Sequence, residues 1–130
     1  GVAAEVIAAV KILAHAIGFG LPLLIALFPA AALLAQDAGR VETLATGLAI
    51  AIPALASLAV LSASLTAGLK GGNAIGGLLV LPLAVPLLIF GAGMLDPSGR
   101  GAVKLLAAVS LLLTAIGPFA AGAALRGLRE

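Results

Sequence analysis

The chain has 130 residues, of which 63% are hydrophobic and 9% are charged, and its mean hydropathy is +1.32. A soluble domain is about half apolar and about a quarter charged, so a water-covered exterior is excluded and lipid is the expected surrounding. The net charge of +2 comes without a basic run and with few aromatic residues, so nucleic-acid binding has no support. Cys is absent, which excludes disulfides and thiolate metal sites.

Four apolar stretches with few charges follow one another along the chain. A helix that crosses a bilayer needs about 20 predominantly apolar residues. We therefore predict a single transmembrane domain over residues 1–130, with spans at about 12–36, 43–69, 71–95 and 103–126. Lys104 lies at the edge of the fourth span, where its long side chain can reach the headgroups.

Short polar connections separate these stretches, at 37–42, around Lys70 and at 96–101. The Asp-Pro-Ser-Gly sequence in the last connection is typical of a turn, and Gly39 and Gly71 occupy positions where helix C-caps are expected. Because short links join antiparallel neighbours, the predicted fold is all-α: a polytopic bundle of four antiparallel, proline-kinked transmembrane helices.

Basic residues divide almost evenly between the two sides of such a bundle. The side that holds both chain ends carries Lys11, Lys70, Arg126 and Arg129. The opposite side carries Arg40, Arg100 and Lys104. The small excess on the first side favours cytoplasmic chain ends, with Lys11, Lys70 and Arg126 at the cytoplasmic surface.

Prolines interrupt every predicted span. Pro22, Pro53, Pro82, Pro86 and Pro118 are among them. Each proline removes a backbone hydrogen bond, which a membrane tolerates only where a neighbouring helix or water satisfies the freed carbonyl. Pro82 and Pro86 lie one turn apart in mid-span, and two readings stay open for them: a functional hinge or helix break, and a plain kink that improves packing.

A glycine-rich segment begins the third span. It contains Gly71, Gly72, Gly76 and Gly77. The step from Gly72 to Gly76 is a GxxxG spacing, which lets two helices approach closely, so these glycines are predicted to serve helix packing. The segment is not a phosphate loop, because no lysine of the chain is followed by Ser or Thr. ATP hydrolysis is therefore expected on a separate subunit.

His15 is the single histidine and lies four residues after Lys11. With no second histidine or cysteine nearby, an interfacial role, hydrogen-bonded to a neighbouring helix or a headgroup, is favoured over haem or metal ligation. No acid or base lies deep in a span, so neither a catalytic residue nor a metal site is predicted. Isolated hydroxyls such as Ser57 and Ser110 are expected to bond to the preceding turn or to a neighbouring helix.

Three pairs of sequence blocks resemble the CcmB family, the membrane (permease) subunits of the cytochrome c maturation ABC transporter, also called haem exporter protein B. The blocks are 65–72 with 79–91, 11–15 with 20–24, and 117–120 with 123–126. The resemblance covers nearly the whole chain. Since family members are six-span permeases, it implies that this chain corresponds to their C-terminal four spans and is a fragment of a longer subunit.

The resemblance also implies a function and partners. The function is haem export, or ATP-driven release of a haem-loaded chaperone, in the bacterial inner membrane. The implied partners are a CcmA-like ATP-binding subunit, a CcmC-like haem-handling protein, a CcmD-like small membrane subunit and a CcmE-like haem chaperone. No cofactor is expected on this chain: haem would be a handled ligand, with His15 as a haem or partner contact, and ATP would bind the partner subunit.

Two other functions stay open. One is the membrane subunit of another ABC-type exporter, for a lipid, drug or polysaccharide. The other is a passive membrane scaffold without a conformational cycle.

Overall fold

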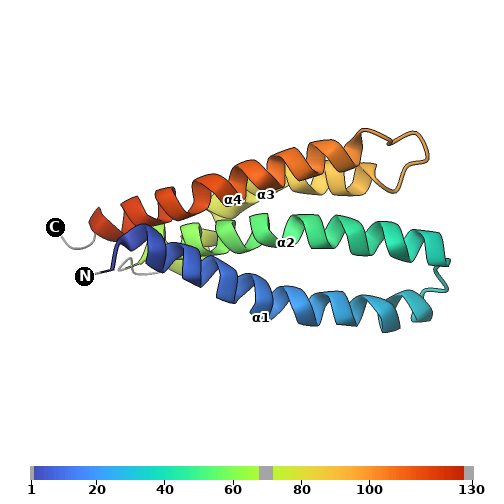
Figure 1. Cartoon of the computed structure of the whole chain (residues 1–130), viewed down its shortest axis with the longest axis horizontal. Helices are drawn as coiled ribbons and strands as arrows, with labels where there is room; N and C mark the ends of the chain where they lie inside the picture. Colours follow the sequence, from blue (N-terminus) through green and yellow to red (C-terminus); the bar gives the residue numbers. More distant parts are fainter. Residues whose placement is uncertain (1, 68–71, 128–130) are drawn as a thin grey trace.

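The described part of the chain forms four long α-helices in the computed structural model (Figure 1). The structure describes residues 2–67 and 72–127, the side chains of 72–74 excepted. The helices are α1 (Ala4–Leu33), α2 (Ala38–Thr66), α3 (Gly72–Gly93) and α4 (Ala102–Gly127). Each is long and apolar enough to cross a membrane. The predicted all-α membrane bundle is confirmed.

Successive helices run in opposite directions, so both chain ends lie at the same end of the bundle (Figure 1). We call this the terminal end. The α1–α2 and α3–α4 connections lie at the opposite end, which we call the loop end. The antiparallel arrangement follows from the short connections, which leave no room for a crossover along the bundle.

Helices α2 and α4 form the centre of the bundle. Each of the outer helices, α1 and α3, packs against both of them, and α1 and α3 do not contact each other within the described residues. In an apolar segment of 18 residues taken from each helix, 33% of the residues are buried in α2 and 28% in α4, against 11% in α1 and in α3. The outer helices therefore give most of their surface to lipid.

Two clusters of buried side chains hold the helices together. The cluster between α1, α2 and α4 consists of Ala8, Ile12, Ala56, Val60 and Ala121. The cluster between α2, α3 and α4 consists of Ala54, Leu58, Leu87 and Leu106. Alanine supplies three of the five residues of the first cluster, whereas leucine supplies three of the four residues of the second. Small side chains let helix backbones approach closely where no hydrophobic force drives helices together in lipid.

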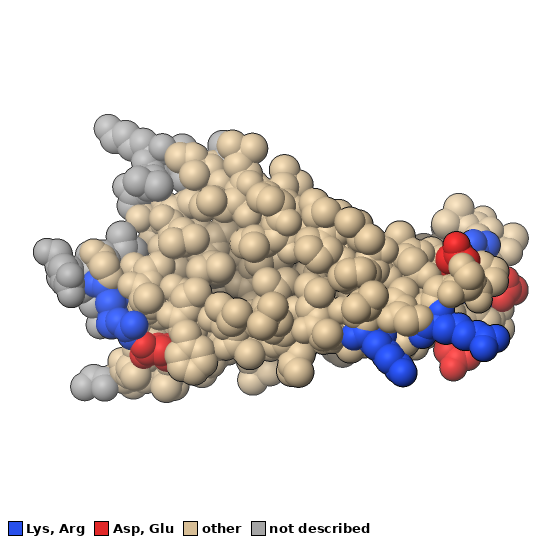
Figure 2. Space-filling model, turned by 90° about the horizontal axis from the view of Figure 1, so that it is seen from above, with Lys and Arg blue, Asp and Glu red and all other residues tan. Residues whose placement is uncertain are grey.

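Large apolar side chains cover the exterior of the bundle. Leu33, Leu111 and Phe119 are 88%, 73% and 68% exposed. Figure 2 shows the charged residues of one face gathered toward the two ends, with uncharged residues between them. An apolar surface this extensive is stable in contact with lipid and would drive aggregation in water.

Helix α1 begins at Ala4, eight residues before the predicted span at Ile12. Glu5 lies in its first turn, where a negative charge favours the positive end of the helix dipole. The part from Ile12 to Leu33 is about 33 Å long, close to the hydrocarbon thickness of about 30 Å. The whole helix of 30 residues is therefore longer than the hydrocarbon, and we expect Lys11, the charged residue that precedes the apolar part, at the membrane boundary.

A left-handed alanine ends helix α1. Ala35 has φ 49°, and its N–H donates to the carbonyl of Ala32 at 3.2 Å, while the N–H of Gln36 donates to the carbonyl of Ala31 at 3.0 Å. These two bonds define a Schellman motif. The predicted C-cap at Gly39 is wrong, because the left-handed position falls four residues earlier and Gly39 already belongs to the first turn of α2.

The polar connections cap and turn the chain at the loop end. Asp37 is the N-cap of α2, and its Oδ1 accepts a hydrogen bond from the N–H of Arg40 at 2.9 Å. In the α3–α4 connection, Oδ1 of Asp96 accepts from the N–H and Oγ of Ser98 at 2.8 and 2.6 Å. These hydrogen bonds hold the pKa of the Asp96 carboxyl below its usual value. The predicted turn is confirmed, and Gly71, the other expected cap, lies outside the described residues.

Candidate functional site

The buried polar side chains among the described residues are the hydroxyls of Ser57, Ser64 and Ser110. Prolines interrupt several helical turns, and His15 lies near the terminal end. Within the described residues, no group of three or more His, Cys, Asp or Glu is arranged to hold a metal ion. The features that could support a function are therefore a groove beside His15, a set of proline-interrupted turns and the glycines at which helices meet.

A groove of about 670 Å³ lies between α1 and α2 near the terminal end; we call it the α1–α2 groove. Lys11, His15 and Phe19 line it from α1, and Ala63 and Ser64 line it from α2. Residues four apart on a helix share a face, so the three α1 side chains form one row along the groove. This row explains why Lys11 and His15, separated by one turn, meet the same space.

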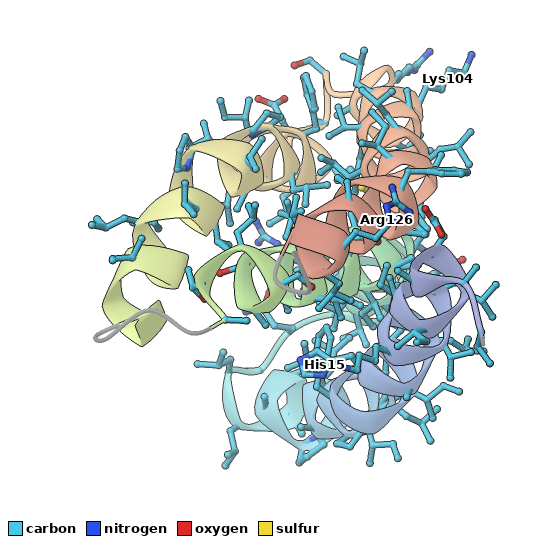
Figure 3. The ribbon with its side chains drawn as sticks, turned by 90° about the vertical axis from the view of Figure 1, so that its left-hand side faces the viewer. His15, Lys104 and Arg126 are labelled. Atoms are coloured by element: carbon cyan, nitrogen blue, oxygen red, sulfur yellow. The ribbon has the colours of Figure 1, made fainter. Side chains whose placement is uncertain are left out.

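His15 is exposed at the side of the α1–α2 groove, and Figure 3 shows it on the side of α1 that faces the rest of the bundle. Its ring meets that of Phe19 edge-on, with 5.6 Å between the ring centroids and 60° between the planes. This contact orients the imidazole against Phe19, and His15 as a whole remains exposed. The geometry fits a residue that meets a headgroup or a partner at the membrane boundary.

A hydroxyl of α4 supports the proline-interrupted turn of α2. Oγ of Ser110, which is buried, donates to the backbone carbonyl of Ile50. Pro53 has no N–H to offer the carbonyl of Ala49, the residue before Ile50. The interhelical bond thus lies where the hydrogen-bond ladder of α2 is interrupted, as expected for serine in a membrane bundle.

Two further hydroxyls at the centre of the bundle have no partner among the described residues. They are Oγ of Ser57 on α2, which is 1% exposed, and Oγ1 of Thr114 on α4. Ser64 and Thr66, in contrast, donate to carbonyls one turn back at 2.8 Å each. The expectation that such hydroxyls bond to their own or a neighbouring helix thus holds for Ser64, Thr66 and Ser110 but not for Ser57 and Thr114.

Pro82 and Pro86 both lie within the continuous helix α3. The helix does not break at either proline, so the structure shows an unbroken conformation of this segment. Pro82 is exposed on the outer surface and Pro86 is partly buried. A hinge at this pair stays a prediction about motion rather than a feature of this conformation.

The glycines predicted to pack at the start of α3 differ in their surroundings. A Cβ on Gly76 would lie 2.5 Å from Oγ of Ser62, so α2 and α3 approach closely there. Gly77 has no atom within 4 Å of its Cβ position, because one residue turns the helix by about 100° and so points it away from α2. Gly71 lies outside the described residues, and Gly72 is described only as the first residue of α3.

Three other glycines at close helix contacts were not predicted. A Cβ on Gly20 would lie 2.5 Å from Ile52, one on Gly117 would lie 2.8 Å from Cβ of Ser57, and one on Gly122 would lie 3.0 Å from the backbone of Glu5. None of these glycines has a second glycine four residues away, so no GxxxG spacing marks them. They differ from the other glycines only in that the rotation of each helix about its axis turns them toward a neighbouring helix.

Lys11 and Arg126, two of the three cations predicted for the cytoplasmic surface, lie near the terminal end. Arg126 forms an ion pair with Glu5, which joins the end of α4 to the start of α1. Figure 3 shows Arg126 at this end and Lys104 farther along α4. Lys11 is exposed one turn before His15, and Lys70 lies outside the described residues.

Four apolar helices that expose large hydrophobic side chains, with charged residues toward the ends, define a multi-pass membrane protein. Its distinctive features are backbone features, prolines and glycines at helix contacts, rather than a catalytic cluster. Residues 1–127 match the family model of the CcmB protein. The chain belongs to the CcmB family.

Several curated relatives support this assignment. The chain is 39% identical over 127 residues to heme exporter protein B of Rhodobacter capsulatus, a match that covers 94% of this chain and 58% of the relative. It is 41% identical over 123 residues to heme exporter protein B of Paracoccus denitrificans, covering 91% and 56%. For that of Haemophilus influenzae the identity is 34% over 121 residues, covering 89% and 55%. The chain thus spans rather more than half the length of these relatives.

Proposed function

We propose that this chain forms the larger part of the membrane subunit of an ABC transporter complex for cytochrome c maturation in the bacterial inner membrane. The observation that supports this most directly is the match to the CcmB family over residues 1–127. The relatives that carry the name heme exporter protein B match across most of the chain. The four apolar helices fit a permease rather than an enzyme.

In this proposal the chain does not hydrolyse ATP. Its sequence has no lysine followed by Ser or Thr, as a phosphate loop requires. A separate CcmA-like ATP-binding subunit supplies the energy. A CcmC-like haem-handling protein, a CcmD-like small membrane subunit and a CcmE-like haem chaperone are the other proposed partners.

ATP-driven release of the haem-loaded chaperone is the form of this function that we favour over haem export. The sequence contains one histidine and no cysteine, so this chain alone cannot build a His–His or His–Cys pair for haem iron. Haem is then a handled ligand rather than a resident cofactor. His15, exposed at the α1–α2 groove, is proposed as a contact to haem or to a partner protein.

The orientation proposed for the subunit has the terminal end, with Lys11 and Arg126, in the cytoplasm. The slight excess of basic residues predicted for this side supports it. Helix α3 is the proposed moving element, because it lies at the edge of the bundle and contains the Pro82 and Pro86 pair.

A chimera tests the function. Residues 1–127 would replace the matching part of heme exporter protein B in Rhodobacter capsulatus, in a strain without its own copy. We expect c-type cytochromes, measured by haem staining of membrane proteins, to be restored, and to be lost again when the ATP-binding partner carries an inactivating substitution. Normal expression of the chimera with no c-type cytochrome would contradict the proposal.

The same experiment separates the alternatives. A passive scaffold would support cytochrome maturation with the inactive ATP-binding partner. The membrane subunit of an exporter for a lipid, drug or polysaccharide would fail to restore c-type cytochromes with either form of the partner.

A further inference from the structure

The α1–α2 groove runs lengthwise along the two helices. On α1 its lining passes from Lys11 through His15 to Phe19, and on α2 from Ala67 through Ala63 to Ala59. Eight residues of helix correspond to about 12 Å. One end of the groove therefore lies at the membrane boundary beside Lys11, and the other lies about two turns deeper toward the centre of the membrane.

Polarity changes along the groove. At the boundary end, Lys11 and His15 offer nitrogen donors, and the ion pair formed by described residues joins Glu5 to Arg126 and leaves Lys11 outside it. The hydroxyl of Ser64 already donates to a carbonyl one turn back in α2. The hydrogen-bond donors left for a ligand thus gather at the boundary end of the groove.

The deeper end of the groove is apolar. Phe19, Ala59 and Val60 line it, and Gly18 has no atom within 4 Å of its Cβ position, so this side of α1 leaves open space. Small side chains on both walls allow a flexible hydrocarbon chain to lie along the helices. A cation at the boundary and an apolar channel below it match the shape and polarity of an amphiphile with an acidic head.

We propose that the α1–α2 groove binds an anionic phospholipid, with the lipid phosphate at Lys11 and His15 and an acyl chain along Phe19, Ala59 and Ala63. Basic pockets between transmembrane helices near the cytoplasmic surface are known to take acidic lipid headgroups. The charge of Lys11 selects an acidic headgroup over a zwitterionic one. The α1–α2 groove is large enough, at about 670 Å³, to take more than the headgroup. The proposal concerns lipid binding and does not depend on the role in cytochrome maturation.

Native mass spectrometry of the detergent-purified chain tests the proposal. Phosphatidylglycerol and phosphatidylcholine with identical acyl chains would be added in equal amounts, and the lipid that stays bound would be counted. We expect phosphatidylglycerol to be retained preferentially. Lys11→Gln should lower its retention about fivefold, the factor contributed by one lysine near an acidic surface, and adding His15→Gln should lower it further.

Two further variants separate a specific groove from general attraction. Lys104→Gln removes a cation of α4 that does not line the groove and should leave retention unchanged. Ala63→Phe fills the groove without changing any charge and should reduce retention of both lipids. Circular dichroism and gel filtration of each variant confirm that the bundle is folded.

Three outcomes would overturn the proposal. Equal retention of the two lipids would remove the acidic-headgroup selectivity. Equal losses in the Lys104 and Lys11 variants would show nonspecific charge attraction. Displacement of the lipid by millimolar inorganic phosphate would show a site for free phosphate rather than for a phospholipid.

Discussion

At the scale of single residues, the end of α1 shows how a side chain can be tolerated in an unfavourable backbone conformation. Ala35 has φ 49° in a position that glycine usually fills. The left-handed conformation costs a non-glycine residue about 1–2 kcal/mol. The hydrogen bonds made by Ala35 and Gln36 to the last turn of α1 hold it there.

Replacing this alanine by glycine should stabilise the chain. We expect Ala35→Gly to raise the free energy of unfolding by up to about 1 kcal/mol, the steric cost being partly offset by the greater freedom of glycine in the unfolded chain. Thermal unfolding in detergent, followed by circular dichroism, measures the change. As a control, Ala107→Gly, at an exposed position inside α4, should destabilise by a similar amount.

Gly117 gives a prediction of the opposite sign. Alanine is normally favoured over glycine inside a helix, but a Cβ at Gly117 would lie 2.8 Å from Cβ of Ser57 on the facing helix. Gly117→Ala should therefore destabilise the bundle by about 1–3 kcal/mol, as overpacking does in a dense core. Chemical denaturation in mixed micelles measures the loss.

Two companion variants test the cause. Gly77→Ala, which meets open space, should be neutral or stabilising. Ser57→Gly combined with Gly117→Ala should recover most of the lost stability, because it removes the opposing Cβ. A Gly117→Ala protein as stable as the parent would show that the two helices can separate without loss.

At the scale of helices, α3 is distinguished by two prolines one turn apart, and within the described residues it packs against α2 and α4 at the edge of the bundle. Neither Pro82 nor Pro86 can donate a backbone hydrogen bond, so the turn between 78 and 86 is held by fewer bonds than a regular helix. Such a turn is the natural place for a helix to bend.

Replacing both prolines tests whether this bend has a function. In the full-length subunit, Pro82→Ala with Pro86→Ala should lower the yield of c-type cytochromes severalfold while expression stays normal, because a regular helix resists bending. The matched control is Pro22→Ala in α1. Unchanged cytochrome yield would leave Pro82 and Pro86 with a packing role only.

The number of helices could be predicted from sequence because the length and hydropathy of each apolar stretch determine whether it can cross a membrane. Length and hydropathy predict four membrane helices, and the described residues form four helices that meet those criteria. The bounds differ most at the start of α1, where the helix continues from Lys11 back to Ala4. Hydropathy measures contact with hydrocarbon, whereas the helix itself continues into the headgroup region.

The contacts between helices could not be predicted in the same way. A helix that is apolar all round carries no pattern that marks its buried face. Gly76 and Gly77 are adjacent and identical in sequence, yet only Gly76 faces a neighbour. The close contacts at Gly20 and Gly122 likewise depend on how α1 and α4 are rotated about their axes, which the sequence does not encode in a pattern.

At the scale of the whole molecule, the exposed apolar surface determines whether the chain stays monodisperse in water or needs lipid or detergent. Leu33, Leu111 and Phe119 are among many large side chains that face outward. We expect the purified chain to aggregate when detergent is removed into buffer and to stay monodisperse when it is exchanged into lipid nanodiscs. Light scattering during detergent removal measures this. A folded, monodisperse chain in detergent-free buffer would contradict the membrane assignment.

Among the described residues α1 and α3 do not contact each other, so we expect the two outer helices to respond separately to force. A force that pulls on α1 reaches α3 only through α2 and α4, so either outer helix can peel away while the middle pair stays joined. In single-molecule extraction from a bilayer, the chain would then yield in separate steps rather than in one rupture. The α2–α4 pair would then stay together as a rigid centre while α1 and α3 move independently of each other.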